Sequence, residues 1–139
     1  LAVMGVDASF AGLELARRRA EDLRTCQGDA RRLPVADAVF DAVYCFGLLH
    51  EFVGESADQD TAGVAQEITR VLRPGGHLVL AVVAGDPSTG LPHLRMFTEA
   101  MFDAVCASFH CAEKTRYDDL GCTGRADYPV WRGWFVKAV

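Results

Sequence analysis

Long apolar runs are missing from this sequence. Its longest uncharged apolar stretch, at 78–84, is far shorter than the ~20 residues that cross a bilayer. No basic segment leads into an apolar one at the start, so we expect neither a membrane span nor a signal peptide.

Basic charge is also scarce, with 14 Lys and Arg against 19 Asp and Glu and a net charge of -5. Because an acidic surface repels phosphate backbones, we expect no nucleic-acid partner. The few basic clusters, Arg31 with Arg32 among them, are expected in solvated loops or on helix faces.

Cysteine occurs five times, an odd number, and no two cysteines have the C-x-x-C spacing. This usage indicates a reduced, cytoplasmic setting and predicts no metal site. A zinc site built from His110, Cys111 and Cys122 is the alternative, although these residues lack the spacing of a zinc finger.

The 139 residues, half of them hydrophobic and 24% charged, suit one globular domain over 1–139 with one core. Apolar periodicity predicts helices over 10–24, from about 60 to 72, and from a Thr98 cap through Phe109. Pro74 and the glycines after it end the second helix. The expected strands are 2–6, 25–27, 41–46, 77–84, 111–117 and 133–139. The apolar run in 77–84 predicts a strand that helices cover on both faces.

This order predicts an α/β fold with a doubly wound, mostly parallel sheet and an antiparallel final strand pair. In such sheets ligands bind beyond the carboxyl ends of the strands. Asp7 and Asp29 follow the first two expected strands, so we expect both at one edge of the sheet. An acid there can accept two hydrogen bonds from a ribose diol. The alternatives are that Asp7 caps the next helix and that Asp29 makes a local turn.

A larger pattern spans nearly the whole chain: "GVDAS", "GDARRLPVADAVFDAVYCFGLLHEF", "EITRVLRPGGHLVLAVV" and "MFTEAMFDAV", in this order. It resembles the class I methyltransferases that use S-adenosylmethionine, and among them the small-molecule branch that includes the quinone-biosynthesis enzymes. The resemblance implies a Rossmann-like fold, S-adenosyl-L-methionine as cofactor and methyl transfer to a small-molecule acceptor.

The resemblance also implies where the cofactor would bind. An acid in the position of Asp7 binds the ribose hydroxyls in that family, and an acid in the position of Asp29 reaches the adenine amino group. The residues that end the third expected strand border the methionine part of the cofactor. The implied cofactor-binding residues are Asp7, Ala8, Asp29, Ala30, Cys45, Phe46 and Gly47.

His50 follows the third expected strand and is the candidate catalytic base. Methyl transfer is an in-line displacement that mainly needs two aligned reactants, and a base can take the proton of an O–H or N–H acceptor. The alternative is a histidine that packs at the start of a helix. Glu51 stands where the family often has a second histidine.

In the family, a strand and a glycine-rich loop precede the position of Asp7, and this sequence shows neither. We therefore expect a partial domain with a gap at the centre of its sheet, between the strands that end in Asp7 and Phe46. Four outcomes are open: a piece cut from a longer protein, two strands that close up and pair, a strand-exchanged homodimer, or an unstable fragment.

Two other functions compete with methyl transfer. One is a catalytically silent binding or interaction module with the same fold, since a fold does not carry activity by itself. The other is a nicotinamide-dependent dehydrogenase, which also uses an acid at a strand end. The pattern "GDARRLP" followed by "FDAVYC" is unlike that of the dehydrogenases.

Overall fold

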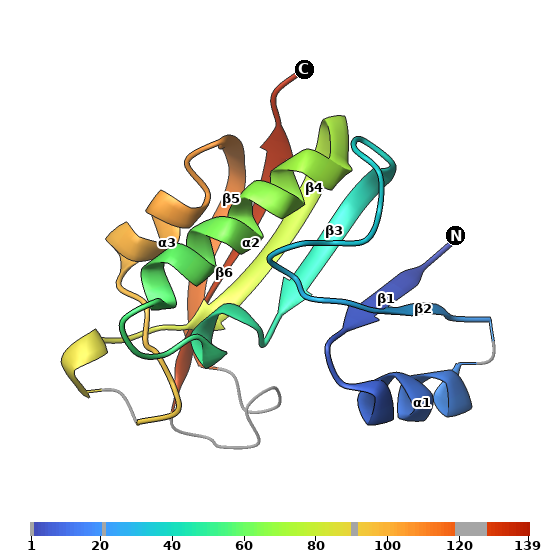
Figure 1. The fold of residues 1–139 in the computed structure, drawn as a ribbon. Coiled ribbons are helices and arrows are strands. Elements are labelled where there is room, and N and C mark those ends of the chain that lie inside the picture. Colours follow the sequence, from blue (N-terminus) through green and yellow to red (C-terminus); the bar gives the residue numbers. More distant parts are fainter. Residues whose placement is uncertain (1, 21, 90–91, 119–127) are drawn as a thin grey trace.

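The computed structural model describes residues 2–20, 22–89, 92–118 and 128–139, and it alternates strands with helices (Figure 1). The elements in chain order are β1 (Met4–Asp7), α1 (Phe10–Arg19), β2 (Arg24–Gln27), β3 (Phe40–Phe46), the 3-10 helix η1 (Leu49–Glu51), α2 (Ala57–Val71), β4 (Leu72–Val83), the 3-10 helix η2 (Pro87–Thr89), α3 (Glu99–Val105), β5 (Phe109–Asp118) and β6 (Pro129–Lys137).

Four strands form the larger sheet, in the order β3-β4-β6-β5. β3 pairs parallel to β4, while β6 runs antiparallel to both β4 and β5. Three strands of this sheet therefore share one direction, and β6 opposes them. The expected Rossmann-like α/β fold with an antiparallel closing pair is confirmed.

The remaining two strands, β1 and β2, form a separate parallel sheet, in register from Met4↔Arg24 to Asp7↔Gln27. Across the described residues, β1 and β3 do not pair with each other. The sheet is therefore interrupted between the strands that end in Asp7 and Phe46, where the gap was expected. The alternative in which these two strands close up is wrong, and the strand-exchanged homodimer stays a prediction.

The hydrophobic core lies between the larger sheet and two helices, α2 and α3, which pack on the same face of it (Figure 1). α2 buries Val64, Ile68 and Val71, whose spacing of three and four residues makes one stripe of the helix apolar. Phe102 of α3 and Phe135 of β6 are almost fully buried and lie with ring centroids 5.7 Å apart. The core thus joins the middle of the chain to its last strand.

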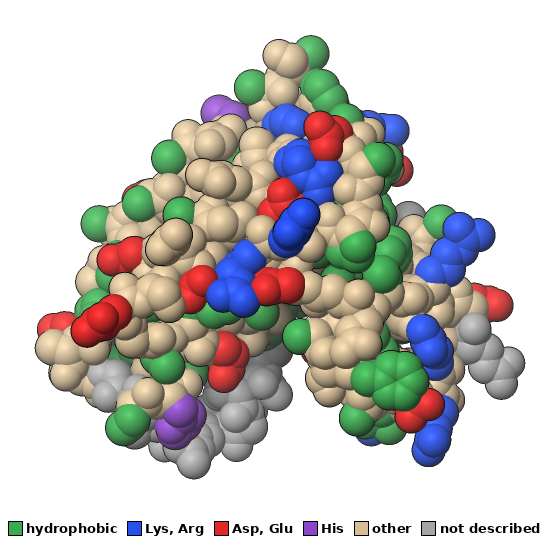
Figure 2. Space-filling model, in the orientation of Figure 1, with side chains coloured by type: hydrophobic (Ala, Val, Ile, Leu, Met, Phe, Trp, Pro, Cys, Tyr) green, Lys and Arg blue, Asp and Glu red, His purple; other side chains and the backbone are tan. Residues whose placement is uncertain are grey.

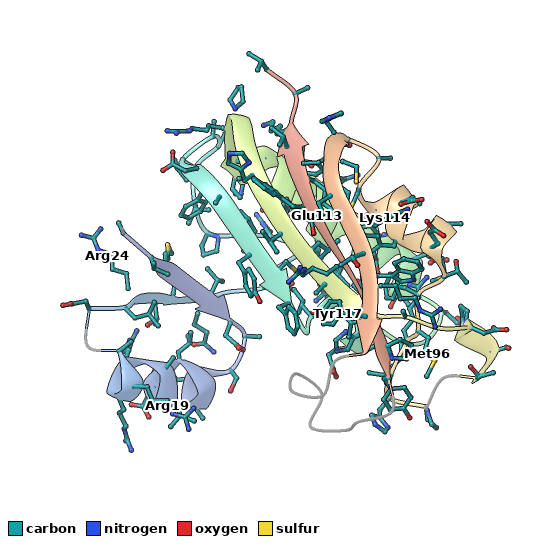
Figure 3. The ribbon with its side chains drawn as sticks, turned by 180° about the vertical axis from the view of Figure 1, so that it is seen from behind. Arg19, Arg24, Met96, Glu113, Lys114 and Tyr117 are labelled. Carbon is teal, nitrogen blue, oxygen red and sulfur yellow. The ribbon has the colours of Figure 1, made fainter. Side chains whose placement is uncertain are left out.

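The opposite face of the larger sheet carries no helix among the described residues (Figure 3). Tyr44 and Trp134 are 70% and 46% exposed, and they flank the half-buried Val79 across three adjacent strands. The expectation that helices cover 77–84 on both sides is therefore wrong for the described part of the chain. The run in 77–84 is apolar because Leu78, Leu80 and the residues that follow them are buried.

Two helix ends differ from the sequence-based expectation. α1 ends at Arg19 rather than near residue 24, because the Ala20 N–H closes the last turn on the Ala16 carbonyl and the chain then turns extended. α3 ends at Val105, and Phe109 begins β5 instead of continuing the helix. The expected Thr98 cap is confirmed, since its hydroxyl accepts from the Met101 N–H at 3.3 Å.

Two strands, β4 and β6, begin well before the expected residues, at Leu72 rather than 77 and at Pro129 rather than 133. Gly75 has a φ of 74°, a left-handed conformation that glycine adopts without steric cost. The turn at Gly75 shifts the register with β3, from Phe40↔Leu72 to Ala42↔His77. Pro74 and Gly75 thus lie within an irregular strand rather than before it. No described helix is both long and apolar enough to cross a bilayer.

Candidate functional site

The carboxyl ends of β1 and β2 lie next to each other, because the parallel register pairs Asp7 with Gln27. The Gly28 N–H continues this pairing and donates to the Asp7 carbonyl at 3.1 Å. The carboxyl end of β3 points to the same side of the molecule as that of β1 (Figure 1). The residues after these strands therefore share one edge.

Asp7 has a local structural role. Its Oδ1 accepts from the Ser9 N–H at 2.7 Å, and the Ser9 hydroxyl caps α1 by accepting from the Gly12 N–H at 3.1 Å. Oδ2 has no hydrogen-bond or ion-pair partner among the described residues, and the residue is exposed. Ala8 follows with its carbonyl accepting from the Gln27 amide at 2.9 Å. The helix start thus uses one carboxylate oxygen of Asp7 and leaves the other open.

Asp29 makes the local turn and also a paired contact with Arg31. Its Oδ1 accepts from the Arg31 backbone N–H at 2.8 Å and from Nε at 3.0 Å, while Oδ2 accepts from Nη2 at 2.6 Å. These hydrogen bonds lower the pKa of Asp29 to about 2, so the carboxylate is ionised at neutral pH. Ala30 lies between them and packs against the core.

Arg31 lies in an exposed loop, as expected, and its side chain has partners there that the sequence did not indicate. Its Nη1 donates to Asp60 Oδ1 of α2 at 2.8 Å, and its guanidinium lies 5.9 Å from the centre of the Phe52 ring. The Ser56 hydroxyl donates to the other Asp60 oxygen at 2.8 Å. Sequence reasoning missed this contact because its partners are 29 residues apart and no motif connects them.

A second group of polar contacts continues along the same boundary between α2 and the chain that links β2 to β3. The Leu33 N–H donates to Glu67 at 2.7 Å, and Arg70 donates to the Val35 carbonyl at 2.8 Å and to Asp37 at 2.6 Å. Figure 2 shows basic and acidic side chains alternating along this boundary. Ion pairs and hydrogen bonds to the backbone therefore hold this link against α2.

The end of β3 presents its residues to opposite faces of the sheet. Cys45 points into the core, where burial raises the pKa of its thiol to about 12. Phe46 points to the face without helices and stacks on Tyr44, with ring centroids 5.8 Å apart. Gly47 then turns with a φ of 73°. Only the backbone of Cys45 is suited to contact a ligand beyond this strand, because its thiol is neutral and enclosed.

His50 is buried, with 8% of its surface exposed, in the 3-10 helix that follows β3. Burial lowers its pKa, which the nearby Glu51 opposes, so the imidazole is neutral at pH 7. Its Nδ1 has no hydrogen-bond partner in the described part of the chain, and Nε2 lies 3.6 Å from Glu51. The Arg95 backbone N–H donates to the His50 carbonyl at 2.8 Å. His50 is thus packed at a helix start and is also in the base form.

The alternative zinc site involves a residue outside the described part of the chain, Cys122. Its other two residues, His110 and Cys111, are exposed on β5. Among the described residues, no three His, Cys, Asp or Glu side chains group closely enough to hold a metal ion.

The sequence was compared with protein families and with curated proteins. Residues 1–80 match the family described as "Methyltransferase domain". The demethylmenaquinone methyltransferase of Beutenbergia cavernae is 41% identical over 119 residues, which cover 85% of this chain and 47% of that protein. The chain therefore spans about half the length of this relative.

The fold was compared with solved structures. An S-adenosylmethionine-dependent methyltransferase of Methanosarcina mazei superposes with a TM-score of 0.83 at 18% identity, over 99% of this chain and 82% of that one. The N-methyltransferase NodS of Bradyrhizobium japonicum, in complex with S-adenosyl-L-homocysteine, gives a TM-score of 0.78 at 16% identity, over 98% and 66%. At these identities the similarity is one of fold, and it includes both sheets of this chain.

Proposed function

Because this chain belongs to the methyltransferase domain family, we propose that it carries the adenosine part of an S-adenosyl-L-methionine site and serves methyl transfer to a small-molecule acceptor. One observation carries the proposal. Two exposed acids, Asp7 and Asp29, follow adjacent parallel strands and keep carboxylate oxygens on the edge where α/β folds bind nucleosides.

The residues at this edge fit an adenosine group. Asp7 Oδ2 is open to accept from ribose hydroxyls, since Ser9 uses only Oδ1. Asp29 is ionised and can accept from an amino group, with the Ala30 backbone beside it. Gly47 leaves bare backbone at the end of β3, next to Phe46. When bound, S-adenosylmethionine supplies a methyl carbon made electrophilic by its sulfonium.

His50 is proposed to take the proton of the acceptor. Its imidazole is neutral at pH 7 because burial disfavours the charged form, so it can accept a proton without first losing one. His50 follows the end of β3 by four residues, and the carboxyl end of β3 points to the same side of the molecule as that of β1 (Figure 1). In this proposal Asp7 and Asp29 bind the adenosine group, and His50 takes the proton that the acceptor loses.

The binding test uses S-adenosylhomocysteine and calorimetry, after circular dichroism has shown that the chain folds. We expect Asp7→Asn to weaken binding by about 1 to 3 kcal/mol, since it removes the charge from two hydrogen bonds to the ribose. Asp22→Asn is the matched control, because this exposed acid precedes β2 at the opposite end of the small sheet. Equal affinities for the two variants would contradict the ribose assignment.

A transfer assay separates the enzyme from a silent module. Labelled methyl from S-adenosylmethionine should appear in a small acceptor, and His50→Gln should slow the transfer while leaving the affinity for S-adenosylhomocysteine unchanged. Binding without transfer to any member of a panel of phenols, quinols and amines would favour the silent module. A folded chain that binds no S-adenosylhomocysteine would contradict the proposal for this polypeptide.

A further inference from the structure

We propose that Arg31 is a positioning residue for Asp29: anchored on α2 by Asp60, it fixes the carboxylate so that one remaining acceptor faces the exocyclic amino group of an adenine. This inference rests on the proposed function. It goes beyond it by assigning base specificity to two residues, Arg31 and Asp60, that would not touch the cofactor.

The hydrogen bonds of Asp29 leave little freedom to its carboxylate. Oδ1 accepts from the Arg31 backbone N–H at 2.8 Å and from the single hydrogen of Nε at 3.0 Å. Oδ2 accepts from Nη2 at 2.6 Å and shares Nε at 3.1 Å. Arg31 thus binds the Asp29 carboxylate with its backbone N–H and with the Nε and Nη2 edge of its guanidinium. These three hydrogens fill three of the about four acceptor sites of the carboxylate, which leaves one site for a ligand.

The position of the Asp29 carboxylate is fixed because the Arg31 guanidinium is itself bound by a second carboxylate, that of Asp60. The side chains of Asp29 and Arg31 are 47% and 46% exposed, and an exposed pair of this kind alone would contribute little. Asp60 is only 17% exposed, binds Nη1 at 2.8 Å and is fixed by the Ser56 hydroxyl at 2.8 Å. The guanidinium therefore spans two carboxylates, one on the loop after β2 and one in the first turn of α2.

A fixed, ionised carboxylate has consequences for which base is accepted. Its oxygens accept hydrogen bonds and cannot donate them, so it favours the amino group of adenine over the carbonyl oxygen that replaces it in hypoxanthine. A site built around such a contact disfavours an analogue that presents a carbonyl oxygen in place of the amino group. A carboxylate that rotates or becomes protonated loses this selectivity, because it can then turn a different atom toward the base.

The test compares two probes, S-adenosylhomocysteine and S-inosylhomocysteine, in which a carbonyl replaces the 6-amino group and N1 carries a proton. Calorimetry measures both dissociation constants for the wild-type chain and for Arg31→Gln, Asp60→Asn and Arg32→Gln. Arg32 is the matched control, since it is the neighbouring exposed arginine and only its backbone N–H binds Asp29, through the carbonyl. Circular dichroism and a urea unfolding curve accompany each variant.

We expect the wild type and Arg32→Gln to prefer the adenine probe by about tenfold or more, the worth of one charge-assisted hydrogen bond. Arg31→Gln should lose most of this preference, and Asp60→Asn should lose part of it although Asp60 does not contact Asp29. This shift in preference is a readout that a purely structural role would not move, because destabilisation weakens both probes alike.

Two results overturn the Arg31 assignment alone: an unchanged preference in Arg31→Gln, or tighter binding of the adenine probe, which would show that Arg31 competes with the base for Asp29. A folded wild-type chain that binds neither probe overturns the proposed function together with this inference. The two failures are therefore distinguishable within one experiment.

Discussion

The two parts of this molecule differ in how they are held together. Residues 40–137 build the larger sheet, α2, α3 and the core, in which Leu80, Phe102 and Phe135 are almost fully buried. In residues 2–39, by contrast, Leu13 is the one buried hydrophobic residue among those described, and Phe10 of α1 is 56% exposed. We call residues 2–39 the thin part and residues 40–137 the packed part. The acids Asp7 and Asp29 belong to the thin part, and His50 belongs to the packed part.

The acids proposed to bind the cofactor are therefore held in place by polar contacts rather than by apolar packing. The thin part is tied to α2 by the ion pairs and backbone hydrogen bonds of Arg31 and Arg70. Such contacts are directional and are screened by salt, whereas apolar burial is neither. Regions with few buried apolar contacts open at lower free energy, and ligand-binding segments are drawn from them.

The sharpest test of the contrast removes one ring from the packed part. Phe102→Ala should lower the free energy of unfolding by about 3 to 5 kcal/mol, because a fully buried ring is lost and a cavity remains against Phe135. Urea unfolding followed by circular dichroism measures the change. Phe10→Ala, in the thin part, should change it by only about 0.5 kcal/mol. Similar losses in both variants would mean that α1 is packed as well as α3.

The second test weakens the ties of the thin part. Arg70→Gln removes the contacts to Asp37, Glu67 and the Val35 carbonyl. We expect faster amide hydrogen exchange in β1 and β2, with β4 and β6 unchanged. Raising the salt concentration should have the same effect on the wild type, since it screens these charges. Arg17→Gln, on the exposed face of α1, is the control. Uniform exchange across both sheets would contradict the contrast.

The smallest expected effect is on the packed side, at His50. Its pKa in the folded chain lies below the ordinary 6.5, because burial disfavours the imidazolium. The unfolded chain therefore binds the proton more readily, so the stability that this residue contributes is present above pH 6.5 and is lost as the pH falls toward the folded pKa. Unfolding curves at pH 7.5 and 5.5 should show this loss, and His50→Gln should reduce it. An equal pH dependence in the variant would show that His50 is not responsible.

Much of the fold could be predicted from local patterns. The strand ending in Asp7 and the strand ending in Phe46 follow from apolar runs, and the interruption between them follows from the family resemblance, in which another strand lies there. Element ends were harder, as at Ala20 and Phe109, because a helix continues or stops according to which carbonyl its next N–H can reach. Periodicity does not record that choice.

The candidate site, like the fold, could be predicted from the sequence only in part. Asp7, Asp29 and His50 could be proposed as site residues because each follows a strand, and sequence order is enough to place strand ends at one edge. The contact between Arg31 and Asp60 could not, because it depends on how the loop after β2 lies against α2. Whether Cys45 or Phe46 faces the core could not be predicted either, since every residue from Ala42 to Phe46 is apolar or aromatic.

The position of β6 governs the order in which the chain can fold during synthesis. β6 lies between β4 and β5 and pairs with both, yet its residues, 129–137, leave the ribosome after those of its two neighbours. Until then β4 and β5 have no common partner, and the pocket that Phe135 fills stays open. A nascent chain arrested before residue 129 therefore exposes one free edge of β4 and a β5 without a strand partner to chaperones, and synthesis of β6 completes the sheet in a single closing step.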